Sequence, residues 1–258
     1  MYSKSFNLGI NKKISPFNKN IKIDSDKSIS IRSFIISSIS QNISQIENAL
    51  ESEDVLSTIN CLKELGVKIV KLNKSRYAVY GKGLGSLFIK KNRSLNFGNS
   101  GTLARLLIGI LSTTPGIEVK VFGDHSLNKR SMKKLIDILE EFGAFFYPKN
   151  KFNFPLKLIS SEIPIGVNYK AGVSAQLKSA VILAGLNSFG ITRIYEKQMS
   201  RDHTENMLLN NHKVIKIKKT NPKNILVSGK KYLNPVNVSV PGDPSSAAFF
   251  VALTILNK

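Results

Sequence analysis

The sequence predicts a mixed α/β (α+β) fold in which one β-α-β-α-β-β unit occurs three times. Two observations support this prediction. A short polar segment followed by apolar residues at helical spacing recurs about every seventy residues, with serines at positions 28, 100, 174 and 245. Between these segments, stretches typical of a strand, a second helix and a hairpin recur in the same order. A fixed period of this kind indicates a supersecondary unit that is copied along the chain.

The first helix of each unit is expected to begin at the polar segment. Ser, Asp, Asn and Gly are favoured at helix amino termini, where side-chain oxygens accept hydrogen bonds from free backbone N–H groups. Behind the second and third openings, apolar residues three and four apart form one helix face. These residues are Leu103, Leu106, Leu107 and Ile110 in the second unit, and Leu177, Ala180, Val181 and Ala184 in the third.

The remainder of each unit is expected to be a strand, an amphipathic helix and a hairpin. The strands are predicted over residues 44–50, 117–121 and 191–196. The second helices are predicted over 53–66 and 131–143, with a weaker pattern over 202–211. The hairpins are predicted over 68–81, 145–159 and 213–227. Gly66 and Gly143 suit the left-handed residue that ends many helices.

The units divide the chain into a complete lobe and a further segment. Three units fill residues 21–235, and a strand over 237–240 with a helix over 245–256 begins a fourth. That last helix is apolar on all sides, a pattern typical of burial on every side. We therefore expect residues 236–258 to start a second, incomplete lobe, and we interpret the chain as incomplete.

Composition narrows the possible ligands. The 258 residues carry 38 Lys and Arg against 17 Asp and Glu, a formal charge of +21. The lysines are dispersed without a run of five, and the abundance of Lys, Ile and Asn is typical of AT-rich coding sequences. A nucleic-acid site is usually a patch or a stripe. We therefore expect a basic surface and no specific nucleic-acid ligand.

The sequence also indicates where the protein works. Its apolar runs fall short of the roughly 20 residues that a membrane helix needs, and its start lacks the apolar stretch of a secretory signal. We expect a cytoplasmic protein with no membrane partner. The single cysteine, Cys61, fits a small core residue. The isolated His125, His203 and His212 fit the polar surface, so we predict no metal site.

The helix openings indicate small anionic ligands. A helix amino terminus combines free N–H groups with the positive end of the helix dipole. Four of the seven arginines lie in or beside openings of first or second helices: Arg32, Arg105, Arg130 and Arg201. Because arginine forms paired hydrogen bonds with carboxylates and phosphates, several such openings favour a polyanionic small substrate.

Six motifs resemble the 5-enolpyruvylshikimate-3-phosphate synthase family of enolpyruvyl transferases, in order and spacing. They are Asp26-Lys27-Ser28-Ile29-Ser30-x-Arg32, Gly98-Asn99-Ser100-Gly101-Thr102-x-x-Arg105, Gly123-Asp124-x-Ser126-Leu127-x-x-Arg130-x-Met132, Ser174-Ala175-Gln176-x-Lys178-Ser179-Ala180, Ser200-Arg201-Asp202-His203-Thr204-Glu205 and Pro241-Gly242-Asp243-Pro244-Ser245-Ser246-Ala247.

The resemblance implies an inside-out α/β barrel of two lobes with three repeats each. Residues 1–20 would then belong to the second lobe, and the full-length protein would be a monomer. The implied reaction transfers the enolpyruvyl group of phosphoenolpyruvate to the 5-hydroxyl of shikimate 3-phosphate. It proceeds through a tetrahedral intermediate and releases phosphate, without metal or organic cofactor. This is a step of the shikimate pathway of aromatic amino-acid biosynthesis.

The resemblance also implies roles for individual residues. Lys27 would be catalytic and would contact both substrates. Ser28 and Arg32 would hold the shikimate carboxylate. The 3-phosphate would meet Ser174, Ala175, Ser200 and Arg201, while Gln176 would lie against the ring and reach phosphoenolpyruvate. The phosphoenolpyruvate site would comprise Lys27, Asn99, Gly101, Thr102, Arg130 and Gln176.

The sequence departs from the family pattern at three places close to the predicted binding residues. Asp24-Ser25 replaces the usual Pro-Gly, Ile31 stands where His or Asn is common, and Ser131 replaces a proline. Asp24 adds a negative charge beside an anion site, which should weaken binding. The family's proton-accepting Asp and a Glu, Lys and Arg group lie in the second lobe. We therefore expect this chain to be inactive alone.

Two alternatives stay open. One is the related transferase that acts on UDP-N-acetylglucosamine, although the first and fifth motifs favour shikimate 3-phosphate. The other is a non-catalytic basic remnant that binds anions or nucleic acid.

Overall fold

The computed structural model describes residues 9, 18–211 and 213–256. Within this part of the chain, the strands form three four-stranded sheets with equivalent order. The first sheet is β12 (Val238–Ser239), β1 (Ile43–Glu47), β3 (Arg76–Tyr80), β2 (Lys68–Asn73). The second is β4 (Ser94–Asn96), β5 (Glu118–Phe122), β7 (Leu156–Ile159), β6 (Phe145–Tyr147). The third is β8 (Asn168–Ala171), β9 (Ile191–Glu196), β11 (Lys223–Ser228), β10 (Ile215–Lys218).

The pairing within the sheets confirms the repeated unit. In each sheet the first strand named above runs parallel to the second, and the other two are antiparallel to their neighbours. The strand-helix-strand crossover of the predicted unit is thus present in the second and third sheets, and the closing hairpin in all three.

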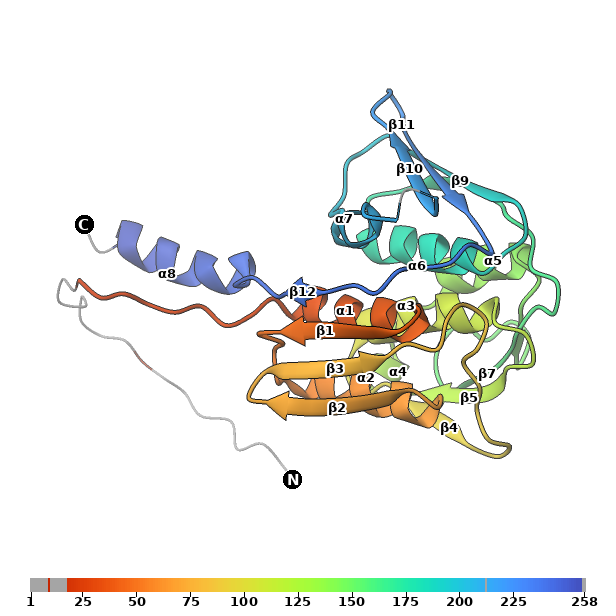
Figure 1. The fold of residues 1–258 in the computed structure, drawn as a ribbon, viewed down its shortest axis with the longest axis horizontal. Coiled ribbons are helices and arrows are strands. Elements are labelled where there is room, and N and C mark those ends of the chain that lie inside the picture. Colours follow the sequence, from red (N-terminus) through yellow and green to blue (C-terminus); the bar gives the residue numbers. More distant parts are fainter. Residues whose placement is uncertain (1–8, 10–17, 212, 257–258) are drawn as a thin grey trace.

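Three inner helices fill the space between the sheets (Figure 1). They are α1 (Lys27–Ile39), α3 (Gly101–Ser112) and α6 (Ala175–Leu186). Apolar side chains on nearly all their faces are buried, as is typical of helices covered on every side. A Cβ atom at Gly109 of α3 would lie 2.7 Å from the Ala180 carbonyl oxygen of α6, so glycine permits this close approach of two inner helices.

The outer helices are α2 (Glu53–Glu64), α5 (Lys133–Glu141) and the short α7 (His203–Leu208), with one turn, α4 (His125–Asn128), between β5 and α5. Gly66 and Gly143 follow α2 and α5 with φ of +84° and +91°, which confirms their predicted role. The weak helix predicted over 202–211 is shorter than expected. The turn that follows α7 is held from outside the helix, by the Asn234 N–H donating to Asn211 Oδ1 at 2.8 Å.

The first sheet departs from the predicted unit. The first unit was expected to open with its own strand from about residue 21, but residues 18–25 contribute only an isolated bridge, Ser25 to Gly242. Instead β12, from the far end of the chain, runs parallel to β1 with Ile46 beside Val238. The strand predicted over 44–50 ends at Glu47 because Asn48 turns to a positive φ of 55°. The side-chain amide of Asn48 donates to the Val240 carbonyl at 2.7 Å.

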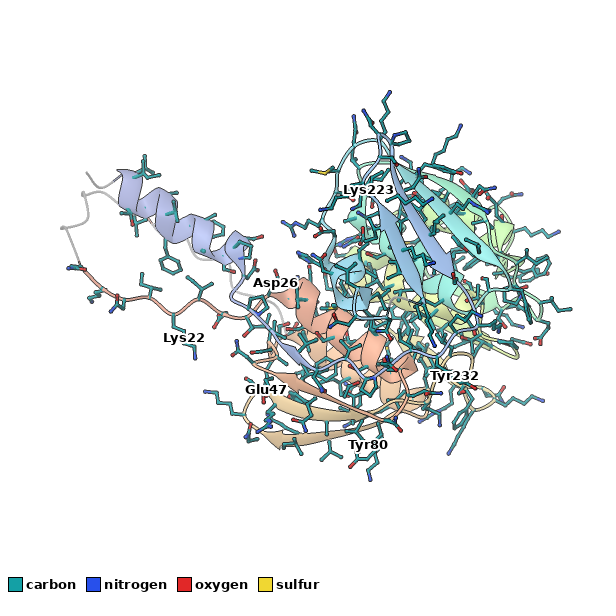
Figure 2. All side chains as sticks on the ribbon, turned by 45° about the horizontal axis from the view of Figure 1, so that its top comes forward. Lys22, Asp26, Glu47, Tyr80, Lys223 and Tyr232 are labelled. Atoms are coloured by element: carbon teal, nitrogen blue, oxygen red, sulfur yellow. The ribbon has the colours of Figure 1, made fainter. Side chains whose placement is uncertain are left out.

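The helix α8 (Pro244–Leu256) leaves the body of the molecule on the same side as residues 18–25 (Figures 1 and 2). None of its described residues is buried, and the side chains of Phe249 and Leu256 are 78% and 80% exposed. The helix α8 is therefore apolar on all sides and yet exposed to solvent. Among the described residues, no helix is long and apolar enough to cross a membrane.

Candidate active site

The amino termini of the three inner helices are capped by the side chains that the sequence predicts at helix openings. Asp26 Oδ1 accepts a hydrogen bond from the Ile29 N–H at 2.8 Å. Ser100 Oγ accepts from the N–H of Leu103 at 3.2 Å, and Ser174 Oγ accepts from the N–H of Leu177 at 3.3 Å. A serine that accepts in this way keeps its own O–H for another partner. The Ser174 hydroxyl can therefore donate to a ligand.

A cavity of about 240 Å³ lies where α1, α6 and α7 meet. Its lining comprises Ser28, Arg32, Ser174, Ala175, Gln176, Arg201 and His203. Six of these residues are those that the sequence predicts for shikimate 3-phosphate. They come from the first and third units of the repeat, and the fold brings them to one place.

Arg32 is the buried cation of this cavity, with 3% of its surface exposed. Its Nε donates to Thr204 Oγ1 at 3.0 Å, and its two terminal nitrogens donate to the Ser28 carbonyl at 3.0 Å and to Ser179 Oγ at 3.3 Å. Burial lowers the pKa of Arg32 to about 10, against the opposing effect of Glu205. The guanidinium stays charged near neutral pH, and two of its five N–H groups remain for an anion.

Lys27 lies apart from this cavity. Its ammonium group forms an ion pair with Asp54 Oδ2 of α2 at 2.9 Å, and its side chain is 48% exposed. An exposed pair of this kind is weak. Lys27 can therefore leave Asp54 for a ligand at little cost in free energy.

Apart from Lys27, the residues predicted for phosphoenolpyruvate form a second group beside the cavity. Arg130 donates to Asn99 Oδ1 at 3.1 Å. A Cβ atom at Gly101 would lie 2.9 Å from Nη1 of Arg105 and 3.1 Å from Nη1 of Arg130, so both guanidinium groups border this glycine. Burial, together with Arg130, lowers the pKa of Arg105. Two cations placed side by side in this way favour an anion between them.

Gln176 connects the two groups. Its Oε1 accepts from Arg105 at 2.8 Å, and its Nε2 donates to Thr102 Oγ1 at 2.9 Å. The same side chain lines the cavity. Gln176 thus contacts residues of the second group while it lines the cavity, and its contact with both substrates stays a prediction. The sequence had placed Arg105 at an opening without assigning it a ligand.

Ser200 is predicted to contact the 3-phosphate together with Ser174 and Ala175. Within the described chain it is not among the residues that line the cavity. Both its N–H and its hydroxyl donate to Glu196 Oε1, at 3.0 and 2.8 Å. The reason is its contact with Glu196, which belongs to a group of buried charges that the sequence pattern does not predict.

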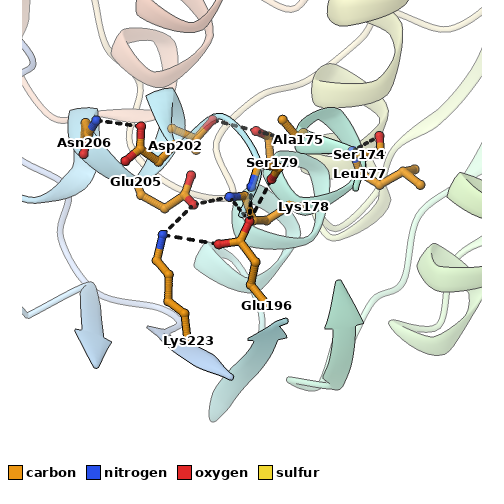
Figure 3. Close-up of polar contacts among 12 residues, drawn as sticks. Ser174, Ala175, Leu177, Lys178, Ser179, Glu196, Asp202, Glu205, Asn206 and Lys223 are labelled. Atoms are coloured by element: carbon orange, nitrogen blue, oxygen red, sulfur yellow. Dashed lines mark hydrogen bonds and ion pairs between the residues drawn. The ribbon is translucent and has the colours of Figure 1, made fainter. Parts of the chain in front are cut away.

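We call this group the buried ion cluster; it consists of Lys178, Glu196, Glu205 and Lys223 (Figure 3). The side chains of the first three are 0% exposed, and that of Lys223 is 19% exposed. The Lys178 ammonium lies 2.6 Å from Glu196 Oε1 and 2.7 Å from Glu205 Oε1. Lys223 lies 3.3 Å from Glu196 Oε2. The cluster joins α6, β9, α7 and β11 by charge-assisted contacts.

His203 also differs from its expected place on the polar surface. It lines the cavity, and its Nδ1 is buried without a hydrogen-bond partner among the described residues. Burial lowers the pKa of His203, and the nearby Arg32 acts in the same direction. Its position after Ser200 and Arg201 in the fifth motif was the signal that could have assigned it. Cys61, by contrast, is buried as predicted, and burial raises the pKa of its thiol to about 12.

Known proteins share this arrangement of sequence and fold. Residues 11–258 match the family described as EPSP synthase (3-phosphoshikimate 1-carboxyvinyltransferase). The 3-phosphoshikimate 1-carboxyvinyltransferase of Vesicomyosocius okutanii is 42% identical over 92% of this chain and 54% of its own length. That of Zymomonas mobilis is 37% identical over 96% of this chain and 54% of its own length.

A solved structure agrees in fold. The EPSP synthase of Acinetobacter baumannii superposes with a TM-score of 0.80 and 34% sequence identity, over 89% of this chain and 51% of the other. The chain therefore spans about half the length of the relatives that it matches. A family match over nearly all its residues, with the fold and the predicted motifs in place, shows that the chain belongs to the EPSP synthase family.

Proposed function

We propose that this lobe binds shikimate 3-phosphate in the cavity between α1, α6 and α7. The observation that supports it most is the lining, where two arginines, two serines and the amino terminus of α6 meet. The carboxylate would lie against Ser28 and Arg32. The phosphate would lie against Ser174, the Ala175 N–H and Arg201, with Ser200 nearby. Each of these groups supplies a cation or a hydrogen-bond donor to a fixed negative charge.

We propose that phosphoenolpyruvate binds next to this cavity, at Asn99, Gly101, Thr102 and Arg130, with Lys27 and Arg105. Gln176 touches both groups, so both substrates would meet at that side chain. Two anions held side by side need several cations to offset their mutual repulsion. The four arginines of the two groups, with Lys27, would supply that charge.

The activity that we propose for a whole protein containing this lobe is enolpyruvyl transfer. The 5-hydroxyl oxygen adds to C2 of phosphoenolpyruvate, the hydroxyl proton leaves, and C3 takes up a proton, which gives a tetrahedral intermediate. Loss of phosphate and of a C3 proton then restores the double bond. This lobe binds and orients the substrates, and Lys27 is its proposed catalytic residue.

We also propose that residues 1–20 and 236–258 belong to a second lobe of the whole protein. The exposed apolar side chains of α8 support this for the second segment, although β12 pairs with β1. The whole protein would be monomeric, cytoplasmic and free of specific nucleic-acid contacts.

A matched pair of serine variants tests the proposed binding site. Calorimetric titration of the chain with shikimate 3-phosphate and with shikimate should show clearly tighter binding of the phosphorylated ligand. Ser28→Ala should weaken both ligands alike, because both carry the carboxylate. Ser174→Ala should weaken only shikimate 3-phosphate, by about tenfold to a hundredfold for one charge-assisted contact. Equal affinity for the two ligands, or equal effects of the two substitutions, would contradict the assignment.

A turnover measurement tests whether this lobe alone binds the substrate without converting it. The 258-residue chain alone should bind shikimate 3-phosphate without converting it, because the general base is expected in the second lobe. Phosphate release from phosphoenolpyruvate, measured with chain purified from a host that lacks the enzyme, checks this. Release that depends on Lys27 would place the whole catalytic apparatus in this lobe instead.

A further inference from the structure

The Ser200 hydroxyl has a single proton to donate, and both Glu196 and the proposed 3-phosphate would accept it. In the structure the proton points to Glu196 Oε1, at 2.8 Å. The bonds from Lys178 and Ser200 outweigh burial and lower the pKa of Glu196 to about 2, so this carboxylate is ionised and only accepts. A phosphate dianion also only accepts. The hydroxyl therefore cannot satisfy both groups at once.

Ser174 differs from Ser200 in this respect. Its oxygen accepts from the Leu177 N–H, which leaves its proton unassigned among the described contacts. Ser200 gives both its N–H and its O–H to Glu196. Ser174 can therefore donate to the phosphate without losing another hydrogen bond from its hydroxyl. Ser200 must first give up its hydroxyl bond to Glu196.

The buried ion cluster allows Glu196 to lose the bond from Ser200. Lys178 Nζ lies 2.6 Å from Glu196 Oε1, the oxygen that Ser200 contacts, and Lys223 Nζ lies 3.3 Å from Oε2. When the hydroxyl turns away, two ammonium groups still contact the carboxylate. Without them, a buried and unpaired negative charge would remain.

We propose that the Ser200 hydroxyl is a shared donor, held by Glu196 and released to the 3-phosphate, and that Glu196 is a positioning residue that sets the affinity for the phosphate. This rests on the proposed function. It explains why Ser200 is outside the cavity lining while Arg201 and His203 belong to it. It also makes Glu196 a determinant of the preference for phosphorylated over unphosphorylated ligand.

The test compares two buried carboxylates in the same cluster. Glu196→Gln replaces a charged acceptor by a weaker neutral one, so shikimate 3-phosphate should bind about fivefold to tenfold more tightly while shikimate is unchanged. Glu205→Gln is the matched control: it removes the same charge, also at 0% exposure and also in contact with Lys178, but no hydrogen bond joins Glu205 to Ser200 among the described contacts. It should leave the ratio of the two affinities unchanged.

A double variant separates hydrogen bonding from simple charge. In a Ser200→Ala background, Glu196→Gln should no longer increase the affinity ratio, because the shared proton is gone. An increase that persists there, or an equal increase with Glu205→Gln, would overturn the proposal in favour of long-range electrostatics. A structural role alone would lower the affinity for both ligands together.

A further comparison does not depend on the folding of the Glu196 variant. Ser200→Ala should weaken shikimate 3-phosphate by less than about threefold, because the bond gained to phosphate only replaces the bond to Glu196. Ser174→Ala should weaken it at least about tenfold, since that proton is not otherwise assigned. Effects of equal size, or a larger effect at Ser200, would overturn the shared donor. If the unmodified chain does not prefer shikimate 3-phosphate to shikimate, the proposed function itself fails, and this inference fails with it.

Discussion

Replacing Lys178 by methionine should destabilise the lobe strongly. Methionine has a similar length but no charge, so the change removes the ammonium group that lies 2.6 and 2.7 Å from two carboxylates with 0% exposure. Among the described ion pairs, Lys223 then remains with them, at 3.3 Å from Glu196 and 3.9 Å from Glu205. Removing one partner of a buried ion pair costs about 3–5 kcal/mol. For a chain of this size that corresponds to a melting temperature lower by about 6–20 °C.

Thermal and urea unfolding of matched variants measure this loss. Lys223→Met is the control, because its side chain is 19% exposed and solvent partly screens its contacts, so a loss below about 1 kcal/mol is expected. The double variant Lys178→Met/Glu205→Gln removes one charge of each sign and should recover part of the loss. The reasoning would be refuted if Lys178→Met melted within about 2 °C of the unmodified chain, or if the two lysine variants behaved alike.

Three further outcomes are expected. Gly101→Ala should weaken phosphoenolpyruvate about tenfold in a calorimetric titration with little change in melting temperature, because its Cβ would lie 2.9 Å from Arg105 and 3.1 Å from Arg130; unchanged affinity would contradict this. Removing residues 244–258 should reduce the self-association seen in light scattering and leave the stability of the lobe unchanged. Removing residues 236–258 should also lower the stability, because β12 is lost. Equal stability of the two truncated chains would contradict this. Folding lowers the pKa of Glu196 from 4.5 to about 2, so the stabilisation by its charged form is present above pH 4.5 and is lost as the pH falls toward 2. The difference in unfolding free energy between the unmodified chain and Glu196→Gln should therefore shrink over that range. A constant difference would contradict the lowered pKa.

What could be predicted from the sequence is mostly local. Helix caps depend on residues three or four apart, so the openings at Asp26, Ser100 and Ser174 were readable from their chemistry. Gly66 and Gly143 were readable for the same reason, because a positive φ suits glycine. The ligand roles that the family motifs imply stay predictions, although the fold brings six of the eight residues predicted for shikimate 3-phosphate to one cavity.

What could not be predicted depends on partners far apart in the sequence. The pairing of Ile46 with Val238 joins residues from opposite ends of the lobe, and nothing in either segment specifies it. Lys178 lies on an apolar helix, where the pattern alone does not show that Glu196 and Glu205 meet it. The withdrawal of Ser200 from the cavity lining is a consequence of that contact. Long-range electrostatics, not helix propensity, decides the final geometry of the site.

The pairing of β12 with β1 brings the two ends of the lobe side by side. The Asp26 N–H donates to the Pro241 carbonyl, and the Asp243 N–H donates to the Asp24 carbonyl, both at 2.8 Å. The chain thus leaves the lobe where it came in, through two adjacent backbone segments. Any domain connected through them would join the lobe beside the capped start of α1. A circular permutant that joins these two segments and opens the chain at a distant hairpin should keep the cavity, because none of its lining residues would change neighbours.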